Sequence, residues 1–582
     1  MLYNYNSTYS REDTIHSLLQ HAVKGRQGIT DYWKRMRSYY DGVHNTAAYS
    51  NAFNNDNGID WQAAQSTDGY IHVESQIDAA LPEFEFSPRG KDDGDKAKQR
   101  EKIVRYICDR NDLEFKNSRN ERRLGIYGSA VWKVCWDSSV NEDGTNGEVT
   151  IDNPAPEQIY PDPTALRVDD CEYIGYVYPM HIAKAHRVFG SELHERGIDL
   201  EDIVKSSKNR LYDTPFEENV SETRLSDTVR ITEWWFRQPE DGETVFTYTE
   251  NGKLCRETVS YRAGDIALSI LVGDYEVRYI PKYWQDTDCT MFPFVIYDRL
   301  PKEKTLWGRS ELEAIIPLID AADREIAYAQ LNSAFSSNDV IVAEENAFAD
   351  DSELDNTPGA VWKLRPGMMG KVQRLGNAAY SESYLHANFD KWRSLMQETT
   401  GNFAVSQGSE PDRVTTATGI ALLNERARSR SNLKRIDKSA GFARLFELCD
   451  RTALEYYDDG RIIFSGAADD EDTVYTAGDY RRTDGDKTYI PRVDVRIHIG
   501  DGLANSKAFT VSAVSSLIST PITAENYRIV KSYLELIDLP MRQEINDMLD
   551  ERFGSTDTET SLSELFEDIA ESTEETEDTA NE

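Results

Sequence analysis

Cysteine is scarce in this chain and follows no metal-binding or disulfide pattern. Among 582 residues there are six cysteines, and no two of them form a C-x-x-C pair. This scatter argues against a zinc domain built on such pairs and against a small disulfide scaffold. It is typical of a protein that folds in a reducing cytoplasm. The six are Cys108, Cys135, Cys171, Cys255, Cys289 and Cys449.

Long apolar runs are also missing. The best run, Ile266 to Val272, is far shorter than the roughly 18 residues that a membrane-spanning helix needs. The first residues, Met1 to Tyr5, have neither the basic region nor the apolar core of a signal peptide. The sequence therefore predicts no membrane association.

Familiar catalytic motifs are absent too. Gly367 to Lys371 lacks the four-residue spacer of a phosphate-binding loop, and neither H-E-x-x-H nor G-x-S-x-G occurs. Ser431 to Lys434 fits S-x-x-K, but it lies among charges within a predicted helix and is interpreted as a chance match. We therefore predict that the chain is not an enzyme and needs no cofactor or metal.

Positive charge is in short supply. Lys and Arg total 65 against 103 Asp and Glu, which gives a net charge of −38. Such a chain should bind nucleic acid weakly, because that affinity depends on cations that neutralise phosphates. A channel wall that repels phosphate would still let duplex DNA slide. Eleven of the acids lie between Thr556 and Glu582, a Ser/Thr/Glu-rich stretch without Lys or Arg that predicts a disordered tail.

The first half of the chain mixes helical and strand patterns. Helical spacing is predicted over 11–42 and 93–111, and Glu83 to Ser87 alternates as a strand does. Val131 to Trp136 and Glu148 to Ile151 predict two strands joined by a hairpin turn. Hydrophobic residues make up 39% of the sequence, which is enough for real cores. The predicted fold class is α+β.

Between Leu306 and Tyr457 the pattern becomes unusual: two helices bracket a small insert. Ser310 to Glu313 reads as a capping box that would open a helix over 310–335, with Pro317 kinking or restarting it. The insert is predicted over 338–376, with short strands near 340–343, 361–364 and 372–375. A second helix of about 20 residues follows.

The last third opens on a polar loop, Gly401 to Thr415, and then a stretch from 416 to 458 without proline. At 1.5 Å per residue this stretch predicts a helix of roughly 60 Å. Strands near 461–464 and 493–499 and helices near 505–519 and 524–552 complete the prediction.

Several segments together resemble the portal proteins of tailed bacteriophages, in the podophage-like group. The first is Trp33 with Tyr39-Tyr40-Asp41-Gly42. The others are Ala80 to Arg89, Tyr127 to Val134, Trp307-Gly308-Arg309-Ser310 and Arg413 to Ile420. The order and spacing of these motifs carry the resemblance, which covers about 30–550.

The resemblance implies a portal fold with a mixed α/β wing, a two-helix stem bracketing a small clip, a long spine helix and a helical crown. The implied divisions are the wing (1–305), first stem helix (306–337), clip (338–376), second stem helix (377–399), tunnel loop (400–415), spine helix (416–459), wing strands (460–503), crown-like helices (504–554) and acidic tail (555–582).

The resemblance also implies a function. Portal proteins form a dodecameric ring at one capsid vertex, through which duplex DNA passes without sequence-specific binding during packaging and ejection. Their partners are the terminase packaging motor, tail adaptor proteins, and the major capsid and scaffold proteins. The protein would be made in the host cytoplasm and reside in the virion. The alternatives are another head–tail or capsid structural protein, or a DNA-processing enzyme.

Charged residues supply the candidate sites. Candidates for contact with DNA in the channel, or for surface solvation, are Lys391, Arg393 and Arg413. Candidates in the clip for contact with DNA or the motor are Lys363, Arg365, Lys371 and Arg374, and the acidic loop with Asp350, Asp351 and Glu353 would dock a basic partner or be solvated. Spine cations interpreted as intersubunit or solvated ion pairs, with DNA contact as the alternative, are Arg426, Arg428, Arg430, Lys434, Arg435 and Lys438.

Overall fold

Two antiparallel sheets form the centre of the computed structural model. It describes residues 11–561 with gaps; those longer than two residues are 45–63, 90–93, 206–227, 350–362, 376–381, 401–416, 464–472, 499–520 and 523–559. A five-stranded sheet has the order β10-β9-β6-β5-β4, and a three-stranded sheet has the order β11-β2-β3. Their strands are β2 (Ser129–Glu142), β3 (Thr145–Asp152), β4 (Ile159–Pro161), β5 (Tyr173–His181), β6 (Thr228–Arg237), β9 (Ile266–Val272), β10 (Tyr275–Ile280) and β11 (Phe294–Asp298).

The five-stranded sheet is covered on both faces. Strand β9 is buried along its whole length, and its side chains alternate between two cores because successive residues point to opposite faces. Ala267 and Leu271 pack in a small core with Ile15 and Leu19 of helix α1 (Arg11–Tyr40). The other face joins the main hydrophobic core, towards helices α6 (Ile182–Glu195) and α7 (Leu200–Lys205).

The expected hairpin is confirmed: β2 and β3 pair antiparallel. Strand β1 (Glu83–Pro88) is also confirmed, and its partner is β18 (Val493–His498), so distant parts of the chain share one ribbon. Helix α4 (Gly94–Arg110) follows β1 as predicted, and α5 (Leu113–Tyr127) comes after it. The mixture of helices and antiparallel sheets confirms the α+β class.

The long helix is α11 (Ala417–Tyr456), 40 residues long. In its C-terminal part Phe446 stacks on Phe84 of β1, with 4.1 Å between ring centroids. The approach to β11 is so close that a Cβ on Gly441 would lie 2.6 Å from the Cβ of Tyr297. Glycine at this position lets the helix lie directly on the sheet.

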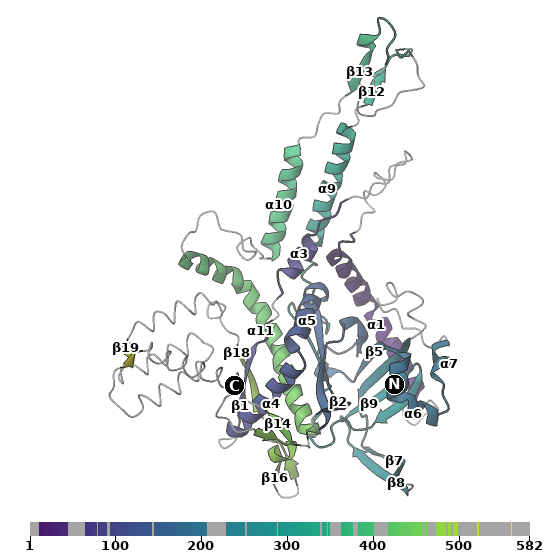
Figure 1. Ribbon diagram of the computed structural model, residues 1–582, viewed down its shortest axis with the longest axis vertical. Coiled ribbons are helices and arrows are strands. Elements are labelled where there is room, and N and C mark those ends of the chain that lie inside the picture. The colour runs from purple at the N-terminus through teal and green to yellow at the C-terminus, as the bar shows by residue number, and fades with distance from the viewer. Residues whose placement is uncertain are drawn as a thin grey trace, which may run out of the picture.

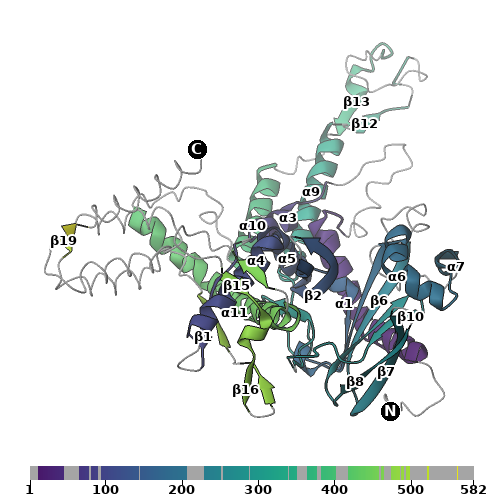
Figure 2. The same cartoon turned by 60° about the horizontal axis from the view of Figure 1, so that its bottom comes forward.

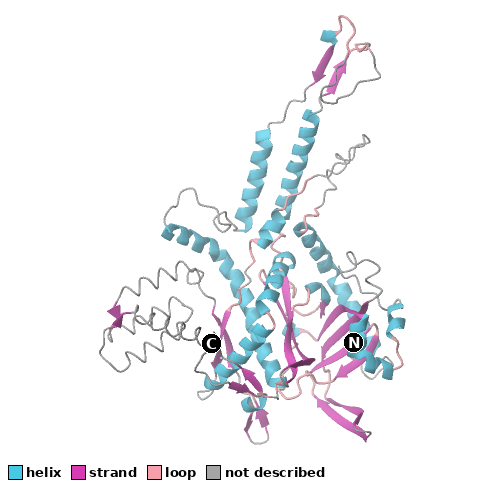
Figure 3. Ribbon diagram, in the orientation of Figure 1, coloured by secondary structure: helices cyan, strands magenta, loops and turns pink. Residues whose placement is uncertain are grey.

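A projecting arm stands away from this core (Figures 1 and 2). It consists of α9 (Ile316–Ser337), the paired strands β12 (Val340–Ala343) and β13 (Val372–Leu375), and α10 (Glu382–Thr400). Figure 3 shows the two helices side by side with the strands at their far end. The predicted order of helix, insert and helix is confirmed.

Smaller two-stranded sheets complete the described chain. They pair β7 (Gly242–Glu250) with β8 (Lys253–Tyr261), β14 (Arg461–Ile463) with β15 (Thr473–Tyr475), and β16 (Arg482–Asp484) with β17 (Lys487–Tyr489). Strand β19 (Pro521–Ile522) pairs with β20 (Thr560–Ser561). The helices predicted over 505–552 and most of the acidic tail lie outside the described residues.

Three predicted boundaries differ from the structure. Helix α9 begins at Ile316 rather than at 310, so Pro317 lies in its first turn, where a missing N–H costs nothing. Of the insert strand predicted over 361–364, the described residues are Lys363 and Leu364, and Leu364 forms a single bridge with Phe348. The prolines at positions 154, 156, 161 and 163 predict an extended connector, but this segment contains a 3-10 turn at Pro156–Gln158 before β4.

Candidate functional site at the base of the projecting arm

Two glycine motifs far apart in the sequence meet where the arm joins the core. Gly128 ends α5 with a left-handed backbone (φ +85°), and a Cβ there would lie 2.4 Å from the carbonyl carbon of Arg309. A Cβ on Gly308 would lie 2.5 Å from the carbonyl oxygen of Gly128. The Gly308 amide donates to the hydroxyl of Ser129 at 2.7 Å. Only glycines allow the two backbones to approach this closely.

Aromatic side chains, one of them from α1, pack beside the contact between the two glycine motifs. The Trp33 ring meets Trp307 edge-on at 4.9 Å and Tyr127 at 5.9 Å between centroids. Its indole nitrogen donates to the carbonyl oxygen of Tyr127 at 3.1 Å. Trp33, Tyr127-Gly128 and Trp307-Gly308, three of the motifs singled out in the sequence, are thus one cluster in space.

The segment before α9 is held by hydrogen bonds to other elements, and the expected capping box does not form. The hydroxyl of Ser310 donates to the carbonyl oxygen of Gly125 at 3.0 Å, and the amide of Glu311 donates to the same oxygen. The carboxylate of Glu313 accepts from Tyr32 and pairs with Arg309. The hydroxyl oxygen of Ser310 accepts from the amide of Leu312 at 3.2 Å, and the helix starts six residues later than predicted.

Tyr39, near the end of α1, and His44, just after it, contact the first turns of α9. The hydroxyl of Tyr39 donates to Asp320 at 2.5 Å. Burial, together with the Asp320 carboxylate, raises the pKa of Tyr39 to about 12, so the hydroxyl keeps its proton. The ring of His44 stacks on Tyr39 at 4.6 Å and is fully buried.

Both ring nitrogens of His44 face acceptors. Nδ1 lies 2.5 Å from the Asp323 carboxylate and Nε2 lies 3.3 Å from the carbonyl oxygen of Tyr39. Only the doubly protonated imidazolium can donate to both. Burial alone would lower the pKa of His44, but the hydrogen bond and the charge of Asp323, helped by Asp320, raise it above the ordinary 6.5.

The His44–Asp323 pair predicts a pH dependence. Because the folded-state pKa of His44 is raised, its stabilisation is complete below pH 6.5 and is lost as the pH rises through the folded-state pKa. We expect His44→Gln to lower the free energy of unfolding by about 1.5–3 kcal/mol on the acidic side and by less in alkali. Denaturant melts of both proteins across the pH range measure this, with the exposed His21→Gln as control. A pH-independent difference would contradict the imidazolium assignment.

A chain of buried charges links α11 to the arm. Arg299, which follows β11, pairs with Glu121 of α5 and, at 3.2 Å, with Glu311. Lys438 of α11 pairs with the same Glu121 at 2.9 Å. At the other end, His72 of α3 (Asp68–Glu74) lies 3.6 Å from Glu311. All five side chains are buried, so the charges of Arg299, Lys438 and the two glutamates depend on one another for stabilisation.

The ion-pair partner of Lys438 differs from the one expected from the sequence. Its ion pair lies within the chain, whereas the spine cations were expected to pair between subunits or in solvent. The helical spacing contains the reason: Lys438 lies four residues before Phe442 and seven before Leu445, on the buried face of α11. The other spine cations lie within α11, but their side chains are outside the described part; they are Arg426, Arg428, Arg430, Lys434 and Arg435.

The structure gives different surroundings to the residues predicted to contact DNA in the channel. Lys391 is exposed on α10. Arg393 is half-exposed and pairs with Asp68 of α3 at 3.1 Å, which also ties α10 to the base of the arm. Arg413 lies outside the described residues.

At the arm's far end the structure describes part of the clip candidates. Lys363 and Arg365 are exposed, and Lys371 pairs with Glu344 across the paired strands. Arg374 lies in β13, with its side chain outside the described part. The acidic loop with Asp350, Asp351 and Glu353 also lies outside it.

Two further observations concern other classes of site. Within the described ranges, no three His, Cys, Asp or Glu side chains gather in a way that could hold a metal ion. No helix in that part of the chain combines the length and apolar character of a membrane span.

Comparison with known proteins identifies the family. The profile of the family described as phage P22-like portal protein matches residues 62–578, which include the arm and α11 but not Trp33, Tyr39 and His44 of the arm's base. No curated protein sequence matches the chain. The chain therefore belongs to the phage P22-like portal protein family, and it is a structural head–tail connector protein of the phage virion.

Proposed function

We propose that this portal protein closes into a dodecameric ring at one capsid vertex and that viral DNA passes through the ring during packaging and ejection. Besides the family assignment, the projecting arm is the observation that supports this proposal. Two helices packed side by side can line a channel when copies are arranged around an axis (Figure 1). Heterologous contacts that close by rotation generate such a ring.

The charge balance supports a channel that DNA crosses without sticking. On α10 the exposed Lys391 and the paired Arg393 lie between the exposed acids Asp390 and Glu398. The whole chain has a net charge of −38. Few uncompensated cations would face the duplex, so little binding energy from counterion release is available to hold it.

The far end of the arm is the proposed docking platform for the terminase motor during packaging and for tail adaptor proteins afterwards. The exposed Lys363 and Arg365 are the described residues best placed to meet such partners. We further propose assembly with the major capsid and scaffold proteins after synthesis in the host cytoplasm. The wing, stem, clip, tunnel-loop, spine and crown divisions are part of the same proposal.

Electron cryo-microscopy of the purified protein and of virions tests the proposal. We expect closed rings with a central opening and with the arms grouped around the axis, and the same ring at the neck of the virion. A particle without an aperture, or a location away from the head–tail junction, would contradict it. A gel-shift assay should show weak, salt-sensitive duplex binding and no cleavage in Mg²⁺.

A further inference from the structure

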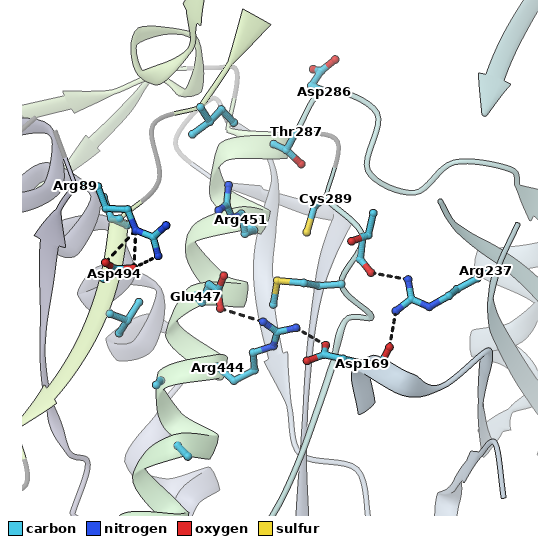
Figure 4. A pocket seen from close by; sticks show the side chains of 17 residues that line it. Arg89, Asp169, Arg237, Asp286, Thr287, Cys289, Arg444, Glu447, Arg451 and Asp494 are labelled. Atoms are coloured by element: carbon cyan, nitrogen blue, oxygen red, sulfur yellow. Dashed lines mark hydrogen bonds and ion pairs between the residues drawn. The ribbon is translucent and has the colours of Figure 1, made fainter. Parts of the chain in front are cut away.

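A groove of about 940 Å³ lies along the outer side of α11. Its other walls come from β18, from the end of β6, from the short 3-10 turn Val168–Asp170 and from the loop before β11. Figure 4 shows charged side chains from these walls pointing towards one another across the hollow. This groove is separate from the base of the arm.

One stripe of α11 forms the floor of the groove. Ala440, Arg444, Glu447 and Arg451 are spaced by three or four residues, so they lie on one helix face. Phe442 and other apolar residues of the opposite face are buried in the core. The helix is thus held firmly from behind while this stripe stays open.

The walls are fixed by hydrogen bonds. The Glu455 carboxylate accepts from the amides of Asp286 and Thr287, each at 2.9 Å, which pins the loop to the end of α11. Arg237 donates to the carbonyl oxygens of Thr290 and Asp169, each at 3.1 Å. A concave surface held in this way is ready for a partner without rearrangement.

The carboxylates of the groove already have partners. Arg444 binds both Asp169 at 2.5 Å and Glu447 at 3.1 Å. Arg89 forms a two-pronged pair with Asp494. Asp286 pairs with Arg481 at 3.1 Å.

One cation in the groove differs from the rest. Arg451 is half-buried and has no ion-pair or hydrogen-bond partner among the residues that the structure describes, and Figure 4 draws it without one. A half-buried guanidinium next to satisfied carboxylates favours an added acid, with which it can form a two-pronged hydrogen-bonded pair.

We propose that this groove receives an acidic side chain of a second copy of the chain, so that it is one half of the contact between neighbouring subunits. The inference rests on the proposed ring, whose heterologous contact requires two different surfaces on each copy. A neighbouring copy offers acids in excess, 103 against 65 basic residues. Duplex DNA fits less well, because its phosphates would meet Asp169, Glu447 and Asp494 along with the arginine.

Two substitutions test the groove without touching the core. Arg451→Glu replaces the expected attraction with repulsion, and Ala440→Trp fills the floor at an exposed position. For each we expect at least about a tenfold rise in the protein concentration needed for half-assembly, measured by analytical ultracentrifugation. Arg187→Glu and Ala183→Trp, both exposed on α6, make the same changes away from the groove and should assemble as wild type. Thermal melts of the monomers should be unchanged.

Cys289 lines the groove and reports on its coverage. Burial raises the pKa of this half-buried thiol, so alkylation is slow but measurable by mass spectrometry. We expect alkylation of Cys289 to slow further when wild-type rings form, and to keep the monomer rate when duplex DNA is added to monomers. Protection by DNA alone would overturn the inference.

The outcomes separate this inference from the proposed function. Wild-type rings together with rings of Arg451→Glu and Ala440→Trp that assemble equally well would overturn the groove contact and leave the ring intact. A wild-type chain that forms no ring under any condition would remove both.

Discussion

Replacing Glu121 with glutamine should lower the free energy of unfolding by about 3–5 kcal/mol, the usual result of removing one member of a buried ion pair. Glu121 is buried and is shared by two cations, Arg299 and Lys438. A neutral amide would leave those cations close together in a site that water does not reach. Arg299 would keep Glu311, whereas Lys438 would lose its ion pair with Glu121.

Urea unfolding of the monomer, followed by tryptophan fluorescence, measures the change. Asp41→Asn is the matched control, because it also removes one carboxylate from an ion pair, the exposed one with Arg37. That pair should contribute only about 0.3–0.5 kcal/mol. A loss below 1 kcal/mol for Glu121→Gln would mean that the buried cluster does not hold the arm to the core.

The same substitution should loosen two separate parts of the chain together. Glu121 connects α11, through Lys438, with the start of the arm, through Arg299 and Glu311. Hydrogen exchange should therefore speed up over 310–319 and over 436–445 in the same variant. Faster exchange in only one of these segments would show that the cluster stabilises without coupling.

Local sequence patterns predicted most elements of the fold, because strand alternation and helical spacing depend on near neighbours. The β2–β3 hairpin, the arm helices and α11 are examples. The start of α9 was predicted too early for a non-local reason. Ser310 fits a capping box by its spacing, yet Gly125, distant in the sequence, takes its hydroxyl hydrogen bond.

Only some of the contacts at the base of the arm could be predicted from the sequence. Its glycine and tryptophan motifs were noticed one by one, but nothing local shows that Gly128 lies against Arg309. Glu121, Arg299 and His44 look like ordinary surface residues in the sequence, because their partners come from other elements. Lys438 was the exception: its place on the apolar stripe of α11, four residues before Phe442, could have marked it as buried.

The arm is thus attached to the core by contacts that tolerate little change. The glycine contact, the aromatic cluster, the His44–Asp323 pair and the buried ionic cluster each include a residue from the first turns of α9 or from the segment just before it. In a ring, a rigid base of this kind would keep the arms at one angle to the axis and so hold the channel at constant width.

Replacing Gly128 with alanine should therefore be among the most damaging small substitutions in the chain, with a cost of about 3 kcal/mol. Two effects add. The left-handed backbone, φ +85°, is unfavourable for any residue with a Cβ, and the new methyl group would lie 2.4 Å from the backbone of Arg309. Backbone on both sides cannot rotate away as a side chain would, so the arm's base must shift relative to α5.

Two other glycines separate these effects. Gly42 also has a positive φ, +75°, but nothing lies within 4 Å of its added Cβ, so Gly42→Ala should cost only the conformational part, about 1–2 kcal/mol. Gly370, at the arm's tip, has open space and no positive φ, and Gly370→Ala should change stability by less than about 0.5 kcal/mol. Thermal and urea unfolding of the three variants give the comparison. If Gly128→Ala costs no more than Gly42→Ala, the close approach of the two glycine motifs does not hold the arm, and the rigidity argued for its base must come from the ionic cluster alone.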